Sequence, residues 1–362
     1  MDDFSLPIQA IKGRGAATRL PHRFAADSRQ ACDDGWDTLQ SAAAEAPSTP
    51  RTTVTFEDAR SVIVANDSPD IYFEYSVNPY RGCEHGCVYC YARPTHSYLG
   101  LSPGLDFETR IIAKRNIAEV LRRELSSKSY VPRLLNIGSA TDCYQPVERE
   151  LRLTRSVIEL MGETRHAFSM VTKSSAIEHD LDLIAPMAAQ GLAAVYVTVT
   201  TLDSELSRKL EPRAAAPARR LRTIRALAAQ GVPVGVSVAP QIPFVNEDME
   251  QVLQAAWEAG ARSAFYTVLR LPWELSPLFR QWLDLHYPQR AARIMARIAE
   301  MRGGKDYDSD FASRMKGFGV WAELLHQRFS KTCARIGFNR ERVELDLGAF
   351  RRPQAVGQGL LF

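Results

Sequence analysis

The sequence repeats one unit several times, namely a short apolar segment, a polar loop and an amphipathic helix. This alternation indicates a parallel sheet whose strands are joined by right-handed helical crossovers. Three junctions place a glycine where a helix should end, at Gly191, Gly231 and Gly260, as a left-handed helix cap favours. A strand at 70–76 would begin the series. The further predicted strands and helices are 133–138 with 154–161, 166–172 with a helix ending at 190, 194–200 with 218–230, 232–239 with 248–259, and 262–269 with 275–285.

Six strands of this kind predict an α/β fold, specifically a partial (β/α)6 TIM-like barrel. Residues 1–52 show little periodicity and are expected to form a flexible or loosely docked N-terminal arm. Residues 53–287 would form the barrel, including one helix over residues 106–125. Residues 288–362 would form a C-terminal helical extension with helices at 290–301 and 318–336.

Three cysteines follow the first predicted strand directly, as Cys83, Cys87 and Cys90 in a CxxxCxxC array. Structural zinc usually takes four ligands in two short pairs, whereas clustered cysteines alone hold iron-sulfur clusters. Three ligands on a four-iron cluster leave one iron open to a substrate or cofactor. A cluster site is therefore expected, with a zinc knuckle or a chance loop of cysteines as the alternatives.

The array, with Tyr89 just before its third cysteine, resembles the signature of the radical S-adenosylmethionine (SAM) superfamily. The resemblance implies a [4Fe-4S] cluster that binds SAM and cleaves it reductively to methionine and a 5'-deoxyadenosyl radical, which abstracts hydrogen. Similarity to a bacterial group related to spore photoproduct lyase extends over most of the chain. It is carried by Lys12-Gly-Arg-Gly15, Asn78-Pro-Tyr-Arg-Gly-Cys83, Thr141-Asp-Cys-Tyr-Gln-Pro146, Leu210-Glu-Pro-Arg213 and Leu269-Arg-Leu-Pro272.

Parallel barrels place their active sites at the carboxyl ends of the strands, so the residues after each strand are the cofactor candidates. By the resemblance, Tyr89 would lie near the adenine and Lys173 would pair with the SAM carboxylate. The SAM amino group would lie near the loop after the second strand. The other candidates are Ser139, Thr141 and Asp142 for that amino group, Thr198 and Thr200 for the ribose, Arg213 for a carboxylate or phosphate, and Leu269 for the adenine.

Each of these candidates also has a purely structural alternative. Ser and Asp form turns, a lysine at a strand end is usually solvated, and Arg213 suits a salt-bridged loop. Cys143 lies in the same interval as a cysteine of spore photoproduct lyase that returns a hydrogen atom to a product radical. By this resemblance Cys143 would sit in the barrel mouth and Tyr91 would regenerate its thiol, with a buried spectator cysteine as the alternative.

The resemblance leaves the substrate open, because one fold hosts many chemistries. The formal net charge of +3 gives no strong argument for nucleic acid, although a DNA lesion or a modified nucleic acid is a possible substrate. Phosphate contacts would come from one of two arginine groups. The first group is Arg219, Arg220, Arg222 and Arg225, for which a solvated helix face is the alternative. The second group is Arg335, Arg340 and Arg342.

Partners and location follow from the same features. A radical SAM enzyme needs a one-electron donor such as flavodoxin or ferredoxin. We expect no membrane association and a cytoplasmic location, because no apolar run is long enough to span a bilayer and the first residues lack a signal-peptide pattern. The six cysteines do not resemble a secreted disulfide framework, and Cys32, Cys143 and Cys333 are too scattered to indicate a second cluster. The alternative function is a non-catalytic iron-sulfur redox or sensor protein.

Overall fold

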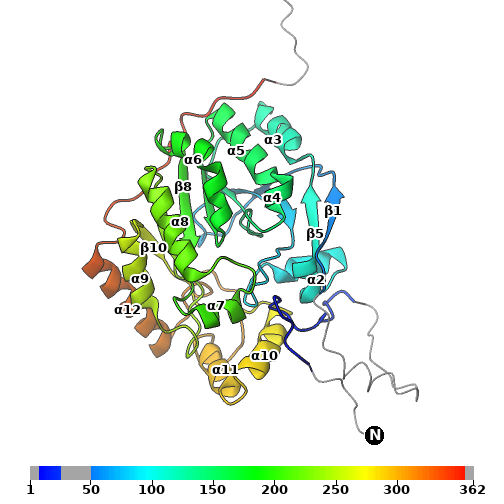
Figure 1. Ribbon diagram of the computed structural model, residues 1–362, viewed down its shortest axis with the longest axis vertical. Helices are drawn as coiled ribbons and strands as arrows, with labels where there is room; N and C mark the ends of the chain where they lie inside the picture. Colours follow the sequence, from blue (N-terminus) through cyan, green and yellow to red (C-terminus); the bar gives the residue numbers. More distant parts are fainter. Residues whose placement is uncertain (1–7, 26–49, 355–362) are drawn as a thin grey trace, which may run out of the picture.

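The computed structural model describes residues 8–25 and 50–354 (Figure 1). Its central element is a seven-stranded sheet with the strand order β10-β9-β8-β7-β6-β3-β2. All neighbouring strands are parallel except β2, which runs antiparallel to β3. The strands are β2 (Ile63–Ala65), β3 (Tyr75–Val77), β6 (Leu135–Ile137), β7 (Phe168–Thr172), β8 (Ala193–Thr198), β9 (Val234–Ser237) and β10 (Ser263–Phe265).

The six parallel strands follow one another in chain order, which confirms the predicted partial barrel. Within the described residues, β10 does not pair with β2 or β3, so the barrel is open on one side. The buried apolar side chains of the central strands lie on the face that packs against the helices, whereas the opposite face carries polar side chains such as Asn136 and Ser169. Valines such as Val195 and Val197 on β8 and Val236 on β9 are completely buried.

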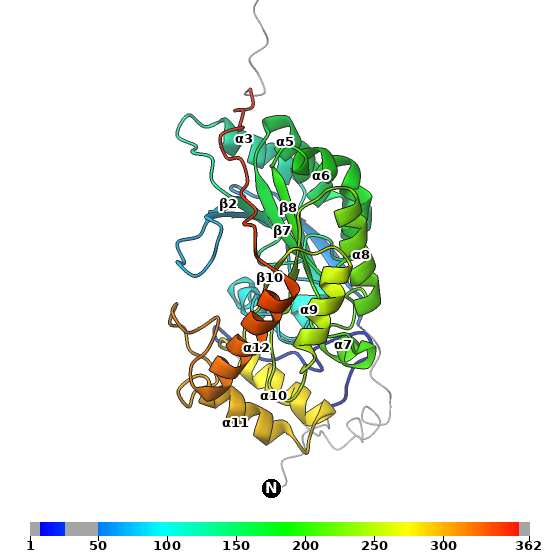
Figure 2. The same ribbon diagram turned by 90° about the vertical axis from the view of Figure 1, so that its left-hand side faces the viewer.

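Helices cover the outer face of this sheet, as Figure 2 shows for α5, α6 and α8. Four of the five longer helices, α5, α6, α8 and α9, match the predicted crossover helices closely. Gly191, Gly231 and Gly260 follow α6, α8 and α9 with positive φ angles, as predicted for helix caps. The longer helices are α3 (Ile117–Ser126), α5 (Leu153–Thr164), α6 (Leu181–Ala188), α8 (Pro217–Ala229) and α9 (Met249–Glu258). The shorter ones are η1 (Arg93–Leu99), α2 (Leu105–Thr109), α4 (Glu148–Leu151), η2 (Ser175–Asp180) and α7 (Ser204–Leu210).

The single helix predicted over residues 106–125 is wrong. The chain forms α2, then the strand β5 (Arg110–Lys114), and only then α3. β5 lies between β1 (Thr53–Glu57) and β4 (Tyr80–Arg81) in a separate three-stranded sheet. Its Ile111 is completely buried and Ile112 partly buried, and this β-branched pair suits a strand that finds partners on both edges.

The C-terminal helices α10 (Leu275–His286), α11 (Ala291–Glu300) and α12 (Val320–Ile336) match the predicted ranges within a few residues. The helix α12 packs against α9, and the rings of Phe329 and Tyr266 lie 4.7 Å apart. The helices α10 and α11 instead pack under the cysteine loop, where Phe279 and Trp282 join the same apolar cluster as Cys87. Every described helix is too short or too polar to cross a membrane.

One ion pair joins segments that lie beside the two unpaired edges of the open barrel. Asp70, in the loop between β2 and β3, accepts two hydrogen bonds from Arg314 at 2.5 and 2.6 Å. The segment around Arg314 is itself attached beyond β10, because Val268 N donates to Met315 O at 2.9 Å. Both side chains of the pair are only 12% exposed. We call this pair the edge latch.

Candidate functional site

The three cysteines lie on the loop that follows β4, with Cys83 and Cys87 buried and Cys90 partly exposed. Burial, and then neighbouring Asp142, Cys87 and Cys90, raise the pKa of Cys83 well above its usual value. Burial also raises the pKa of Cys87 to about 12, although Lys173 opposes this shift. The thiols of Cys83 and Cys87 therefore stay protonated at neutral pH, and a metal centre would displace these protons on binding.

A buried ion pair supports the back of this loop. The Arg93 guanidinium donates to Cys87 O at 2.8 Å and to Gly86 O at 3.0 Å, and it pairs with Glu108 at 2.5 Å. Glu108 in turn accepts the backbone N–H groups of Gly15 and Ala16 at 3.0 and 2.8 Å. Residues 8–25 of the N-terminal arm are thus docked against the cysteine loop through the Lys12-Gly-Arg-Gly15 motif.

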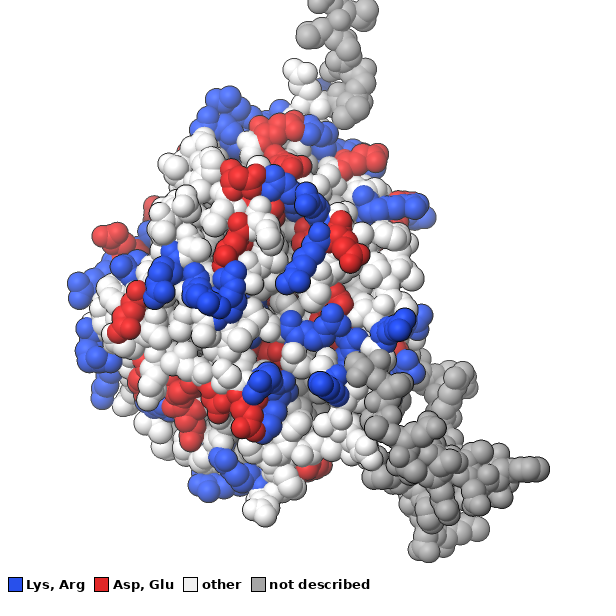
Figure 3. Space-filling model, viewed as in Figure 1, with Lys and Arg blue, Asp and Glu red and all other residues white. Residues whose placement is uncertain are grey.

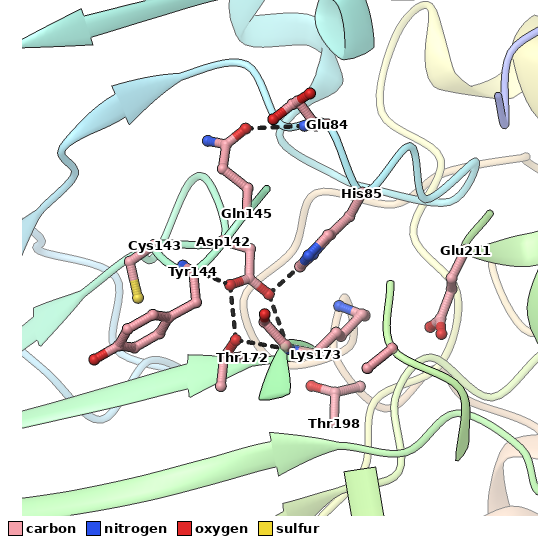
Figure 4. A network of polar contacts seen from close by, with 12 residues as sticks. Glu84, His85, Asp142, Cys143, Tyr144, Gln145, Thr172, Lys173, Thr198 and Glu211 are labelled. Atoms are coloured by element: carbon pink, nitrogen blue, oxygen red, sulfur yellow. Dashed lines mark hydrogen bonds and ion pairs between the residues drawn. The ribbon is translucent and has the colours of Figure 1, made fainter. Parts of the chain in front are cut away.

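Asp142 connects three segments in front of the loop (Figure 4). Its carboxylate accepts from Thr172 Oγ1 at 2.7 Å and from Lys173 N at 2.8 Å, and it lies 3.1 Å from His85 Nδ1. Burial would raise the pKa of Asp142, but His85 and Lys173 hold it well below the usual range. Asp142, expected to contact the SAM amino group, is therefore already occupied by protein partners.

A second buried network surrounds Tyr89. Its hydroxyl donates to Glu211, which also accepts from Thr200 Oγ1 at 2.5 Å and pairs with Arg220. Arg220 is 1% exposed and donates to Thr198 O at 3.1 Å, so the solvated-face interpretation is wrong for this arginine. Thr198 and Thr200 are both buried beside this network.

Lys173 lies between the two networks. Its Nζ is 5.8 Å from the centre of the Tyr89 ring. Burial would lower the pKa of Lys173, but Cys87, Glu211 and Asp142 raise it above its usual value. The lysine is therefore a cation beside Cys87, as expected for a group that binds a carboxylate.

Tyr91 marks the open side of the cysteine loop. Its side chain is 50% exposed, its hydroxyl donates to Ser139 O, and the Arg270 guanidinium lies 5.3 Å from its ring centre. Ser139 Oγ accepts from Asn78 Nδ2 at 3.3 Å. This side, where Cys90 is also accessible, is the mouth of the barrel.

Three other predicted residues lie elsewhere. Thr141 is buried and donates to Tyr80 O at 3.4 Å, and Leu269 is buried in the apolar cluster that contains Cys87 and Tyr89. Arg213 is on the outer side, where it pairs with Glu84 at 3.2 Å. The salt-bridged alternative thus describes the contacts that Arg213 makes.

Cys143 lies in the main apolar core and is 0% exposed. Its Sγ is 3.8 Å from Ile137 O, and burial raises the pKa of its thiol well above the usual value. Figure 4 shows its side chain directed away from His85 and Lys173. The structure thus places Cys143 behind the mouth and not in it, which corresponds to the spectator alternative.

The sequence reasoning missed His85, Arg93, Glu108 and Glu211, which position the cysteine loop. Two signals were present, since His85 lies between two cysteines and Glu211 lies inside the Leu210-Glu-Pro-Arg213 motif. No group of three or more His, Cys, Asp or Glu side chains in the described part of the chain forms a ready metal site. Three neighbouring thiols beside a lysine nevertheless fit an iron-sulfur cluster chemically.

The sequence model of the radical SAM superfamily matches residues 77–256, which include the cysteine loop and strands β4 to β9. The uncharacterized protein Rv2578c of Mycobacterium tuberculosis is 35% identical over 246 residues, covering 66% of this chain and 72% of the relative. The chain belongs to the radical SAM superfamily, as the cysteine motif indicated.

Within the superfamily, the chain is also similar to the uncharacterized protein MJ0683 of Methanocaldococcus jannaschii, at 24% identity over 63% of this chain and 82% of the relative. A structure of spore photoproduct lyase complexed with dinucleoside spore photoproduct matches with a TM-score of 0.52 and 18% identity, and a mutant of that enzyme with 0.53 and 17%. Each match covers 79% of this chain and 81% of the other. The expected relation to spore photoproduct lyase is thus confirmed for the fold.

Proposed function

We propose that the protein is a radical SAM enzyme that carries a [4Fe-4S] cluster on Cys83, Cys87 and Cys90. When bound, the cluster supplies the electron that cleaves SAM to methionine and a 5'-deoxyadenosyl radical for hydrogen abstraction. The observation that carries this proposal is the placement of three thiols at the carboxyl end of the open barrel, with Lys173 fixed beside Cys87.

The protein's own groups would bind and orient the cofactor. Lys173 is the cation available for the SAM carboxylate, because Cys87, Glu211 and Asp142 raise its pKa although burial would lower it. Asp142 and Thr172 fix the backbone at the end of β7, from which Lys173 projects. Tyr89, Ser139, Thr198 and Thr200 stay candidates for the cofactor pocket, whereas Thr141 and Leu269 contribute through the packing around it and Arg213 is paired with Glu84 on the outer side.

A nucleic acid lesion or a modified base is the substrate class that we propose. The related enzyme of known structure is complexed with a dinucleoside photoproduct. In this chain, the half-exposed ring of Tyr72 has its hydroxyl 3.3 Å from Asn136 Nδ2, and Asn136 Nδ2 lies 3.0 Å from Ser169 Oγ. An accessible aromatic ring beside amide and hydroxyl groups suits a flat heterocycle with hydrogen-bonding edges.

Cys143 was expected to return a hydrogen atom and Tyr91 to regenerate its thiol, but Tyr91 is accessible at the mouth and Cys143 is enclosed in the core. A direct donor must touch the product radical, so we propose Tyr91 as the nearer group. Cys143 would act only if hydrogen atoms reached the mouth through another residue.

The test begins with anaerobic reconstitution with iron and sulfide and spectroscopic confirmation of a reduced cluster. Reduction with SAM present should then yield 5'-deoxyadenosine, and a Lys173→Met variant should keep the cluster but bind SAM more weakly. A reduced cluster that yields no 5'-deoxyadenosine would instead support the non-catalytic redox or sensor function. For the substrate class, binding to damaged and undamaged DNA and to RNA should be measured over a range of salt concentrations.

A further inference from the structure

Two hollows lie side by side at the loops that follow β6 and β7, and the residues of the mouth, Cys90, Tyr91 and Ser139, line neither of them. One, of about 300 Å³, lies between α4, α5 and η2 and includes Arg149, Arg152 and Arg155 in its lining. The other, of about 240 Å³, is lined by Arg149, Arg213 and His85 among others. Tyr144 and Arg149 line both hollows, so the two form one groove. We call it the basic groove.

Arginines dominate the lining of the groove, although Glu148 and Asp180 also line its first hollow. Three of its arginines already have carboxylate partners, since Arg155 pairs with Asp180 and Asp182, Arg213 with Glu84, and Arg219 with Glu178. Arg149 and Arg152 are exposed and form no ion pair among the described residues. Figure 3 shows Lys and Arg side chains across the middle of this face, with Asp and Glu side chains among them. The unpaired cations point to an acidic partner.

The floor of the groove reaches the cysteine loop. His85, which lines the second hollow, is two residues from Cys83 and two residues from Cys87. The backbone from His85 through Gly86 therefore gives a short covalent route from the groove to a cluster ligand. The loop is accessible on its other side at Cys90 and Tyr91, where the mouth opens. The loop thus has one side for cofactor and substrate and a second side that the proposed chemistry leaves unused.

We propose that the basic groove is the docking surface for an acidic one-electron carrier protein, an inference that rests on the proposed function. The carrier loses one electron and the cluster gains it, with no bond formed or broken between the two proteins. Encounters between redox partners are typically small, polar and steered by opposite charges, which fits a shallow groove rimmed by arginines. A nucleic acid in this groove would lie beside His85 and away from the mouth, so we favour the carrier.

The test uses the full chain and a bacterial flavodoxin as the probe. The double variant Arg149→Glu/Arg152→Glu reverses the two unpaired charges of the groove. Its matched control is Arg335→Glu/Arg342→Glu, which makes the same charge change at two exposed arginines near the C-terminal end of the described chain. Melting curves of all three proteins establish that the variants fold.

Flavodoxin affinity at low salt should fall roughly tenfold in the groove variant and change less than about twofold in the control. Cluster reduction by reduced flavodoxin, followed by stopped-flow absorbance, should slow by a similar factor, with reduction by dithionite as the internal reference. The wild-type affinity should also weaken as salt rises. Equal losses in the two variants, or no loss in either, would overturn the docking surface.

The same experiment separates this inference from the proposed function. A reduced cluster that yields no 5'-deoxyadenosine would refute the catalytic proposal, yet the flavodoxin affinities would still test the groove. Unchanged flavodoxin binding combined with weaker binding of a single-stranded oligonucleotide to the groove variant would overturn the carrier and identify a nucleic-acid surface.

Discussion

Replacing Arg220 with methionine tests the buried network behind Tyr89. The substitution keeps most of the side-chain volume and removes the guanidinium that pairs with Glu211. It also removes the donors to Ala215 O at 2.6 Å and Thr198 O at 3.1 Å. Both ion-pair side chains are essentially unexposed, at 1% for Arg220 and 0% for Glu211, so solvent cannot replace the lost partner.

Breaking a buried pair by removing one partner costs about 3–5 kcal/mol, because the other charge is left uncompensated. Lys173 and the hydroxyls of Tyr89 and Thr200 still face Glu211, which offsets part of this cost. The carbonyl groups of Ala215 and Thr198, which lose their donor, each add about 1 kcal/mol to this cost. We therefore expect the free energy of unfolding to fall by about 4 kcal/mol.

The assay is urea denaturation followed by far-UV circular dichroism. Arg222→Met, two positions along the same helix on its exposed face, should change the free energy of unfolding by less than about 0.5 kcal/mol. Adding Glu211→Gln to Arg220→Met should restore much of the loss, since the unpaired charge disappears. If Arg220→Met and Arg222→Met have the same effect, the reasoning about this buried pair is wrong.

Three further predictions concern the loop, the core and pH. Gly86→Ala should destabilise the cysteine loop and lower iron incorporation, because Gly86 has a φ of +68° and an added Cβ would lie 2.7 Å from Glu108 Oε2. The matched control is Gly100→Ala, because Gly100 has a φ of +66° but open space around the added Cβ. This control should leave the iron content unchanged. After reconstitution, Cys143→Ala should keep the wild-type iron content and 5'-deoxyadenosine yield, whereas Cys87→Ala should lose both. If Cys143→Ala turns over the true substrate at the wild-type rate, Cys143 is not the hydrogen donor. Burial raises the pKa of Glu148 from 4.5 to about 7, so its folded form binds a proton more tightly than its unfolded form. The free energy of unfolding should therefore fall by about 3 kcal/mol as pH rises from about 4.5 to 7, and Glu148→Gln should flatten that part of the pH profile measured by urea denaturation.

The sequence predicted the parallel strands and crossover helices well, because apolar runs and helix-ending glycines are local signals. It failed at β5, since the adjacent isoleucines Ile111 and Ile112 suit a helix stripe and a strand equally. The outcome there depends on β1 and β4, which become neighbours only in the folded chain.

The three candidate cluster cysteines were equally easy to recognise in the sequence, because their spacing is itself the signal. Their supports were not, since Glu108 contacts Gly15 from 93 residues away and Arg93 carries no periodic pattern. Arg220 stands among three other arginines on α8, and only the position of Glu211 in space distinguishes it from them. Cys143 was misplaced for a similar reason, because the turn after Gly138 directs its side chain into the core.

The edge latch of Asp70 and Arg314 has a consequence for how this scaffold can diversify. In a closed barrel the width of the opening is set by backbone hydrogen bonds between strands, and altering it means rebuilding the sheet. Here two side chains, each on a loop, span the same gap. A pair of substitutions at Asp70 and Arg314 is therefore expected to change the width of this gap while every strand and the three loop cysteines keep their places.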